Sequence, residues 1–307
     1  MNGAAPGPVP ASELASAPVA AKPLFSVLCE LVKARLTFLV LLTTLVGFHA
    51  GVRGPMDWGL LLHALLGTAL LACGAAALNQ LAEREHDARM TRTEDRPLPS
   101  GRLTPESVLL FGGACSVGGL AWLALGTNLL TALLGAATLL SYVFVYTPLK
   151  RVTWLNTAVG AVPGALPPLM GWTAVRGELS LEGWVLFGIL FFWQIPHFLA
   201  IAWLYREEYE KAGFVMLPSL DPDGLRTGGQ AVRHTLALLI ISLAPFLLRM
   251  AGPVYVAGAI LLGGLFLVAA VLFSRQLTRV RARQLFFASI LYLPLLLGLM
   301  AADKLKH

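Results

Sequence analysis

Nine apolar segments, each close to the length of a membrane-spanning helix, follow one another along this chain. A helix needs about 20 apolar residues to cross the hydrocarbon core of a bilayer. With 57% hydrophobic and 13% charged residues, the chain lies far outside the composition of soluble domains. The sequence therefore predicts an all-α polytopic membrane protein. We place its nine transmembrane helices at residues 28–52, 58–82, 107–126, 128–147, 153–175, 181–205, 232–250, 253–273 and 284–302. In the first of these, Lys33 and Arg35 indicate a turn at the membrane surface.

The basic residues predict the orientation of these helices. With nine spans and a cytoplasmic N-terminus, most of the 23 Lys and Arg residues fall in cytoplasmic segments, as the positive-inside rule requires. Topology therefore explains the net charge of +6, and nucleic acid need not be a partner. Residues 1–24 lack an apolar signal core and an Arg-rich transit pattern. We therefore expect them to form a disordered cytoplasmic tail of a protein in a prokaryotic plasma membrane. We expect residues 25–307 to form a single domain.

The most informative polar segment is NQLAEREHDARMTRTEDRPLPSGR, which follows the second apolar run directly. If the preceding helix continues, Asn79, Glu83 and Asp87 share one face at spacings of four residues. An amide and two carboxylates are hard oxygen ligands that suit Mg²⁺, which substrate phosphates often complete. The alternative is an ordinary solvated loop, but Asn79 lies where an unpartnered polar side chain is costly. Further anionic oxygens could be bound by Arg84, Arg89, Arg92, Arg96 and Arg102.

Two more polar junctions are expected on the same membrane face. Glu207 and Glu208 follow the sixth apolar segment and could hold a second Mg²⁺. Tyr146 and Lys150 flank Pro148, which we expect to break the helix so that both side chains turn toward one phosphate group. Taken alone, the Tyr and Lys are better explained by an ordinary belt of aromatic and basic residues at the membrane surface.

His197 lies two to three turns deeper, beside Trp193 and after Pro196. On composition alone, a lone His in an apolar segment is more often a hydrogen-bonded core residue than a ligand.

Four stretches together resemble the UbiA-type intramembrane prenyltransferases, over nearly the whole length after residue 25, and within them the heme-modifying branch. They are LVKARLTFLVLLTTLVGF, the Asn79 segment, YTPLKRVTWLNTAVGAVPGALPPLMGW and FFWQIPHFLAIAWLYREEYEKAGFVMLP. The resemblance implies nine helices around a central cavity, with two acidic loops on the cytoplasmic face. It also implies transfer of the farnesyl group of farnesyl diphosphate to a vinyl group of heme b with addition of water, dependent on Mg²⁺. Proteins that modify heme further or assemble a terminal oxidase would be downstream partners.

Residue by residue, the resemblance implies Mg²⁺ ligands and catalytic roles for the Asn79 row and Lys150, and makes His197 a candidate for heme contact. It implies metal binding by Glu207 and Glu208, where the family more often has an Asp pair. The residues implied in diphosphate binding are Arg35, Arg92, Arg96, Tyr146, Lys150 and Arg151. Two alternatives stay open: the same chemistry with a quinone precursor or chlorophyll-type acceptor, and a secondary transporter, which intramembrane polar residues and kinked helices would also suit.

Overall fold

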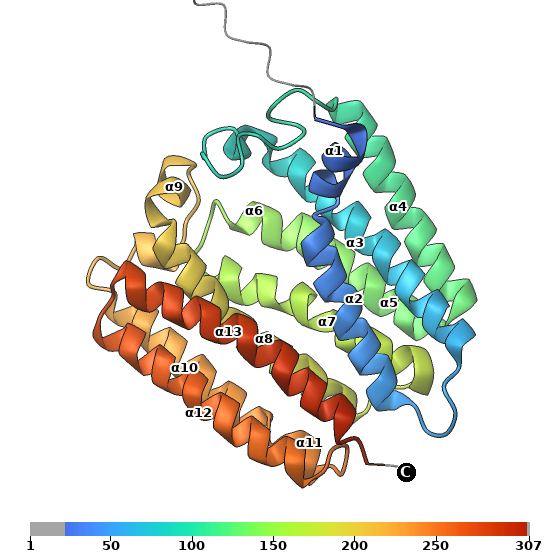
Figure 1. Ribbon diagram of the computed structural model, residues 1–307. Helices are drawn as coiled ribbons and strands as arrows, with labels where there is room; N and C mark the ends of the chain where they lie inside the picture. The colour runs from blue at the N-terminus through green and yellow to red at the C-terminus, as the bar shows by residue number, and fades with distance from the viewer. Residues whose placement is uncertain (1–21, 306–307) are drawn as a thin grey trace, which may run out of the picture.

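The computed structural model describes residues 22–305, and these fold into helices joined by short loops (Figure 1). The predicted tail, residues 1–24, lies outside the described residues except for its last three, of which Leu24 already begins a helix. Within the described part of the chain, nine helices are long and apolar enough to cross a membrane. This agrees with the nine predicted spans and makes the protein a multi-pass membrane protein.

The spanning helices are α2 (Ala34–Gly51), α3 (Trp58–Asp87), α4 (Pro105–Gly126), α5 (Leu129–Leu140), α7 (Asn156–Arg176), α8 (Leu181–Leu204), α10 (Leu225–Ile241), α12 (Pro253–Arg275) and α13 (Arg279–Ala302). The α5 span continues through the π-helix η2 (Ser141–Tyr146) into α6 (Thr147–Leu149), and the α10 span continues into α11 (Ala244–Leu247). Short helices outside the spans are α1 (Leu24–Leu31), α9 (Arg206–Lys211) and the 3₁₀-helix η3 (Leu217–Ser219).

Helix α7 is the centre of the bundle. It packs against α2 and α5 on one side and α8 on the other, while α10, α12 and α13 pack together beyond α8 (Figure 1). Its sequence, NTAVGAVPGALPPLMGWTAVR, is rich in Gly, Ala and Pro, and small side chains allow helix backbones to approach closely in a membrane. Most of its span is buried inside the protein, whereas the outer helices expose large apolar side chains to lipid.

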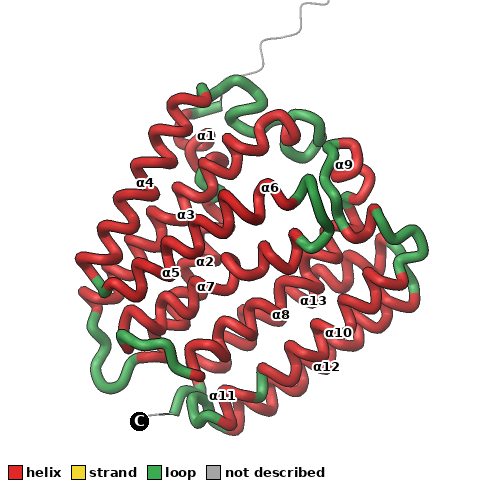
Figure 2. Tube along the Cα trace, turned by 180° about the vertical axis from the view of Figure 1, so that it is seen from behind, coloured by secondary structure: helices red, strands yellow, loops and turns green. Residues whose placement is uncertain are grey.

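The loops and short helices divide between the two ends of the bundle. Helices α1 and α9 lie at one end with the loop that follows α3, while α11 and the C-terminus lie at the other (Figure 2). Because α3 continues to Asp87, the polar residues predicted on its last turns lie on regular helix at the first of these ends. The two acidic segments, far apart in the sequence, therefore meet at one end of the bundle.

Two predicted boundaries were wrong in an informative way. The first segment is broken at Lys33, whose φ of 49° is left-handed, so that α1 and α2 are separate helices and the span begins at Ala34. The seventh span begins at Leu225 instead of residue 232, because an LRTGGQAVRH stretch of low hydropathy is nevertheless helical.

Candidate functional site

Asn79, Glu83 and Asp87 form a buried polar row along the inner face of α3, with exposed fractions of 0%, 3% and 1%. Their shared face confirms that the helix continues as the spacing required. Three buried polar groups beside apolar helices need partners, since an unpaired carboxylate in such surroundings is very costly. In this structure each one binds a different basic side chain.

The three basic side chains come from three other parts of the chain. Lys33 Nζ donates to Asn79 Oδ1 at 2.7 Å, and Lys150 Nζ lies 2.7 Å from Glu83 Oε1. Arg96 Nη1 lies 2.6 Å from Asp87 Oδ2. The row and its three cations, Lys33, Lys150 and Arg96, are named the inner site below. It brings three side-chain oxygens and three basic groups into one place. Metal binding by these oxygens and phosphate binding by these basic groups stay predictions.

Lys33 was not among the predicted site residues, although it was noted as a surface turn. The carbonyls before it are held from α3: Gln80 Nε2 donates to Glu30 O at 3.0 Å and to Leu31 O at 2.7 Å. These bonds fix the break between α1 and α2 and support the left-handed conformation of Lys33. Burial and the nearby Arg96 lower the pKa of Lys33 to about 7.

Lys150 and Tyr146 lie together, but the helix is not broken between them as predicted. Pro148 does not break the helix; a π-helical turn precedes it, and the helix runs on to Leu149. Lys150 Nζ then lies 4.6 Å from the centre of the Tyr146 ring, a cation–π contact. Burial lowers the pKa of Lys150, while Tyr146 and Glu83 raise it by more, so the net shift is upward and the ammonium stays charged. Thr147 completes the corner by accepting from Asn79 Nδ2 at 3.1 Å.

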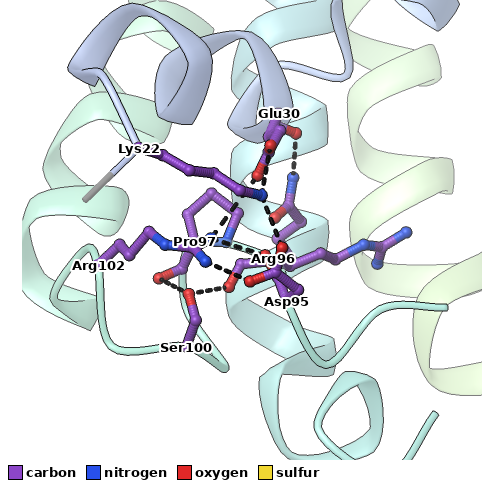
Figure 3. Close-up of polar contacts among 8 residues, drawn as sticks. Lys22, Glu30, Asp95, Arg96, Pro97, Ser100 and Arg102 are labelled. Atoms are coloured by element: carbon purple, nitrogen blue, oxygen red, sulfur yellow. Dashed lines mark hydrogen bonds and ion pairs between the residues drawn. The ribbon is translucent and has the colours of Figure 1, made fainter. Parts of the chain in front are cut away.

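The loop after α3, residues 88–104, is irregular, which suits its Pro and Gly residues. Arg96 points back from it to Asp87, away from a surface cluster that fastens the loop to α1 (Figure 3). In that cluster Lys22 pairs with Glu30 and Asp95, and Arg102 also binds Asp95. The pairing with Lys22 and Arg102 lowers the pKa of Asp95. Helix α1 thus holds the loop that supplies Arg96.

Arg92 connects the same loop to α9. Its guanidinium carbon lies 5.5 Å from the Tyr205 ring centre and 5.8 Å from that of Tyr209, whose hydroxyl accepts a hydrogen bond at 3.4 Å. His86, on the last turn of α3, is bound through Nδ1 to Ala212 O at 2.8 Å. The two acidic segments therefore lie side by side.

Glu207 and Glu208 begin α9, as expected from their place after the sixth span. Glu207 is exposed, and Glu208 Oε2 is buried with no hydrogen-bond partner among the described residues. Both line a cavity of about 170 Å³ with Arg206 and Arg279. Between residues 22 and 305 no three His, Cys, Asp or Glu side chains form a ready metal cluster, so the second Mg²⁺ stays a prediction.

Two of the predicted diphosphate ligands lie apart from the inner site. Arg35 is exposed on the first turn of α2. Arg151 is exposed too, and its Nη2 donates to Ala82 O at 2.8 Å, on a side of α3 that turns away from Glu83. Their roles in diphosphate binding stay predictions.

His197 lies half-buried in α8 between two aromatic rings. Its ring centre is 5.0 Å from that of Trp193 and 5.1 Å from that of Phe286, both nearly parallel to it. Its Nδ1 is 2.7 Å from Ser289 Oγ, and that hydroxyl donates to Phe286 O at 2.5 Å. Because a hydroxyl has one proton, Nδ1–H of His197 is the donor to Ser289, and Nε2 carries the lone pair.

The donor set of the inner site fits Mg²⁺. Carboxylate and amide oxygens on successive turns are the ligands that this ion takes, and it requires only one or two protein carboxylates when phosphates complete its shell. The three cations that now hold these oxygens would be free to bind phosphate when a metal ion takes their place.

Comparisons with known proteins identify relatives in sequence and in fold. The UbiA prenyltransferase family model matches residues 40–291. A relative from Solibacter usitatus, named protoheme IX farnesyltransferase, is 50% identical over 284 residues, covering 90% of this chain and 97% of its own. The solved structure of digeranylgeranylglyceryl phosphate synthase shares the fold with a TM-score of 0.78 at 16% identity, over 91% of this chain and 98% of that one. A UbiA homolog from Archaeoglobus fulgidus, bound to GPP and Mg²⁺, has a TM-score of 0.63 at 17% identity, over 89% and 99%. The chain belongs to the UbiA prenyltransferase family.

Proposed function

We propose that this protein transfers the farnesyl group of farnesyl diphosphate to a vinyl group of heme b, with addition of water, giving heme O and diphosphate. The observation that carries this proposal is the inner site, where each of three oxygens of the kind that Mg²⁺ takes is paired with a basic side chain of the kind that binds phosphate. Relatives that are 41–50% identical and bear the name protoheme IX farnesyltransferase support this acceptor. Quinone precursors and chlorophyll-type acceptors are not favoured, and neither is transport.

The donor's diphosphate binds at the inner site. Lys33, Lys150 and Arg96 donate N–H groups to its oxygens, and the hydroxyl of Tyr146 and Arg92 from the loop complete its surroundings. Asn79, Glu83 and Asp87 would hold Mg²⁺ through their side-chain oxygens, and the bound ion would supply further positive charge to the departing diphosphate. These groups act mainly when the bond between the allylic carbon and oxygen breaks, because negative charge then grows on the leaving group.

The remaining steps need shelter from bulk water. The cationic allylic carbon accepts the π electrons of the vinyl group, and the carbocation that forms on the heme side chain takes the oxygen of one water molecule, which loses a proton. The apolar interior of the bundle would keep bulk water away from this cation.

His197 is our candidate for heme binding, through Nε2 to the iron of the substrate. A His whose Nδ1–H is held by an oxygen acceptor and whose Nε2 is free has the arrangement typical of metal ligands. Flat aromatic partners on both sides, Trp193 and Phe286, fix the plane of the ring. We further propose that the protein lies in a prokaryotic inner membrane with its N-terminus and inner site on the cytoplasmic side, which its bacterial relatives and basic loops support.

The proposal is tested with membranes that contain the protein, heme b and farnesyl diphosphate. We expect heme O to form in the presence of Mg²⁺ and to stop forming when a chelator removes it. Asp87→Asn should abolish product formation while the protein remains inserted. No heme O from active, heme-supplied membranes with Mg²⁺ present would overturn the proposed reaction.

The heme half is tested separately by spectroscopic titration. His197→Ala should lose the spectrum of histidine-bound heme, and Ser289→Ala should weaken it, because the ring loses its oriented Nδ1–H bond. Phe246→Ala, an exposed aromatic on α11 at the opposite end of the bundle, is the matched control. Unchanged heme binding and turnover in His197→Ala would remove this residue from the site.

A further inference from the structure

A cavity of about 390 Å³ lies on the side of α3 that faces away from the inner site. Residues advance by 100° per position in a helix, so Leu81 and Glu85 turn nearly opposite to Glu83. Leu109 at the start of α4 and Phe144 in the π-helix η2 form the other walls. Both are open to the outside, with exposed fractions of 56% and 67%. The cavity is therefore an apolar groove on the lipid-facing surface, and we name it the outer groove.

Two arginines stand at the polar rim of the outer groove, Arg84 and Arg151. The groove lies where α3 ends, α4 begins and the α5 span ends, which is the boundary between hydrocarbon and headgroups. An apolar wall below and guanidinium groups above match the two parts of a phospholipid. Glu85 also lines the rim, but it is 74% exposed on its side chain and only 3.5 Å from Arg84, a loose surface pair.

Arg151 is held in place for this role by α3 itself. Its Nη2 donates to Ala82 O, while its neighbour Lys150 binds Glu83, the next residue of α3. The two adjacent side chains therefore lie on different sides of α3: Lys150 faces the inner site, and Arg151 faces the outer groove. The Arg151 side chain makes no other hydrogen bond within residues 22–305, so its remaining guanidinium N–H groups can bind an anion.

We propose that the outer groove binds one anionic phospholipid, with its phosphodiester between Arg84 and Arg151 and an acyl chain along Leu109 and Phe144. The groove fits a phospholipid better than the prenyl donor, because it has no carboxylate and amide row to hold a metal ion against a diphosphate. The bound phospholipid would also hold Arg151 in place, and therefore the adjacent residue Lys150.

The proposal is tested by native mass spectrometry of the full chain in detergent, titrated with phosphatidylglycerol or with phosphatidylcholine of the same acyl chains. We expect one tightly bound phosphatidylglycerol per chain and weaker phosphatidylcholine binding. Replacing both arginines by Gln should weaken the tight site roughly 30-fold, the effect of two basic residues near an anionic lipid. Arg233→Gln, an exposed arginine on α10, should leave it intact.

A photoreactive phosphatidylglycerol then locates the site, and we expect its label on the peptides that contain Leu109 or Phe144. Arg84→Gln alone, at an exposed position, keeps the test valid should the double variant fold poorly. Equal binding of both lipids, or label spread evenly over the lipid-facing helices, would show ordinary annular lipid and overturn the proposal. Displacement of the label by farnesyl diphosphate would overturn it too, because the groove would then receive the prenyl donor. None of these readouts depends on prenyl transfer.

Discussion

The contact between Asp87 and Arg96 is the place where the proposed metal ion would replace a basic side chain. Asp87 is 1% exposed and Arg96 holds it at 2.6 Å. Arg96→Gln leaves a buried carboxylate without a cation, and breaking a buried pair in this way costs about 3–5 kcal/mol. We expect a lower melting temperature in detergent without Mg²⁺, and a larger stabilisation by added Mg²⁺ than in the wild-type protein. Equal stabilisation of both proteins would contradict the placement of Mg²⁺ at Asp87.

Gly160 is a second position where one atom decides the geometry of the inner site. A Cβ added there would lie 2.4 Å from the Tyr146 ring, so the ring must move and with it the cation–π contact to Lys150. We expect Gly160→Ala to raise KM for farnesyl diphosphate about tenfold, in line with the loss of one buried cation–π contact. Steady-state kinetics measures it. Gly118→Ala on α4, where a Cβ meets nothing within 4 Å, should leave KM unchanged.

At the scale of elements, the crossing of α2 and α7 depends on two glycines. A Cβ on Gly47 would lie 1.9 Å from Pro168 O, and one on Gly171 would lie 2.0 Å from Thr44 O. Neither backbone oxygen can move aside, so either Gly→Ala change should lower the free energy of unfolding by about 1–3 kcal/mol. Thermal unfolding in detergent tests this. Gly264→Ala in α12, with open space around it, should be neutral or stabilise by up to about 1 kcal/mol; equal losses at all three positions would contradict the packing argument.

The elements themselves were largely predictable from the sequence, and the contacts between them were not. Apolar length gave the nine spans, and the spacing of four residues gave the row on α3, because both are local properties of a helix. Lys33 reaches Asn79 across 46 residues and Lys150 reaches Glu83 across 67, so no local pattern records either pairing. The family resemblance implied diphosphate binding by both Lys150 and Arg151, yet the two side chains contact different sides of α3.

At the scale of the whole molecule, the C-terminal residues join the last span to the first. Lys304 Nζ donates to His49 O at 2.5 Å and to Val52 O at 2.7 Å, and these carbonyls end α2. Asp303 Oδ2 accepts from Tyr255 N at 2.7 Å and so caps the start of α12. Two adjacent residues therefore hold three helices at the end of the bundle opposite the inner site.

Because Lys304 and Asp303 hold this end of the bundle, removing their contacts should destabilise the protein there first and not at the inner site. Hydrogen bonds to a charged group contribute about 1.5–3 kcal/mol, so Lys304→Met should lower the free energy of unfolding by about that amount. Amide exchange should quicken first in the last turn of α2, because its terminal carbonyls lose their donor. Arg53→Met, an exposed basic residue just beyond α2, is the matched control and should change neither readout. If Lys304→Met instead loosened the loop that carries Arg96 while α2 stayed protected, the two ends of the bundle would be coupled, and the C-terminal contact would act on the site.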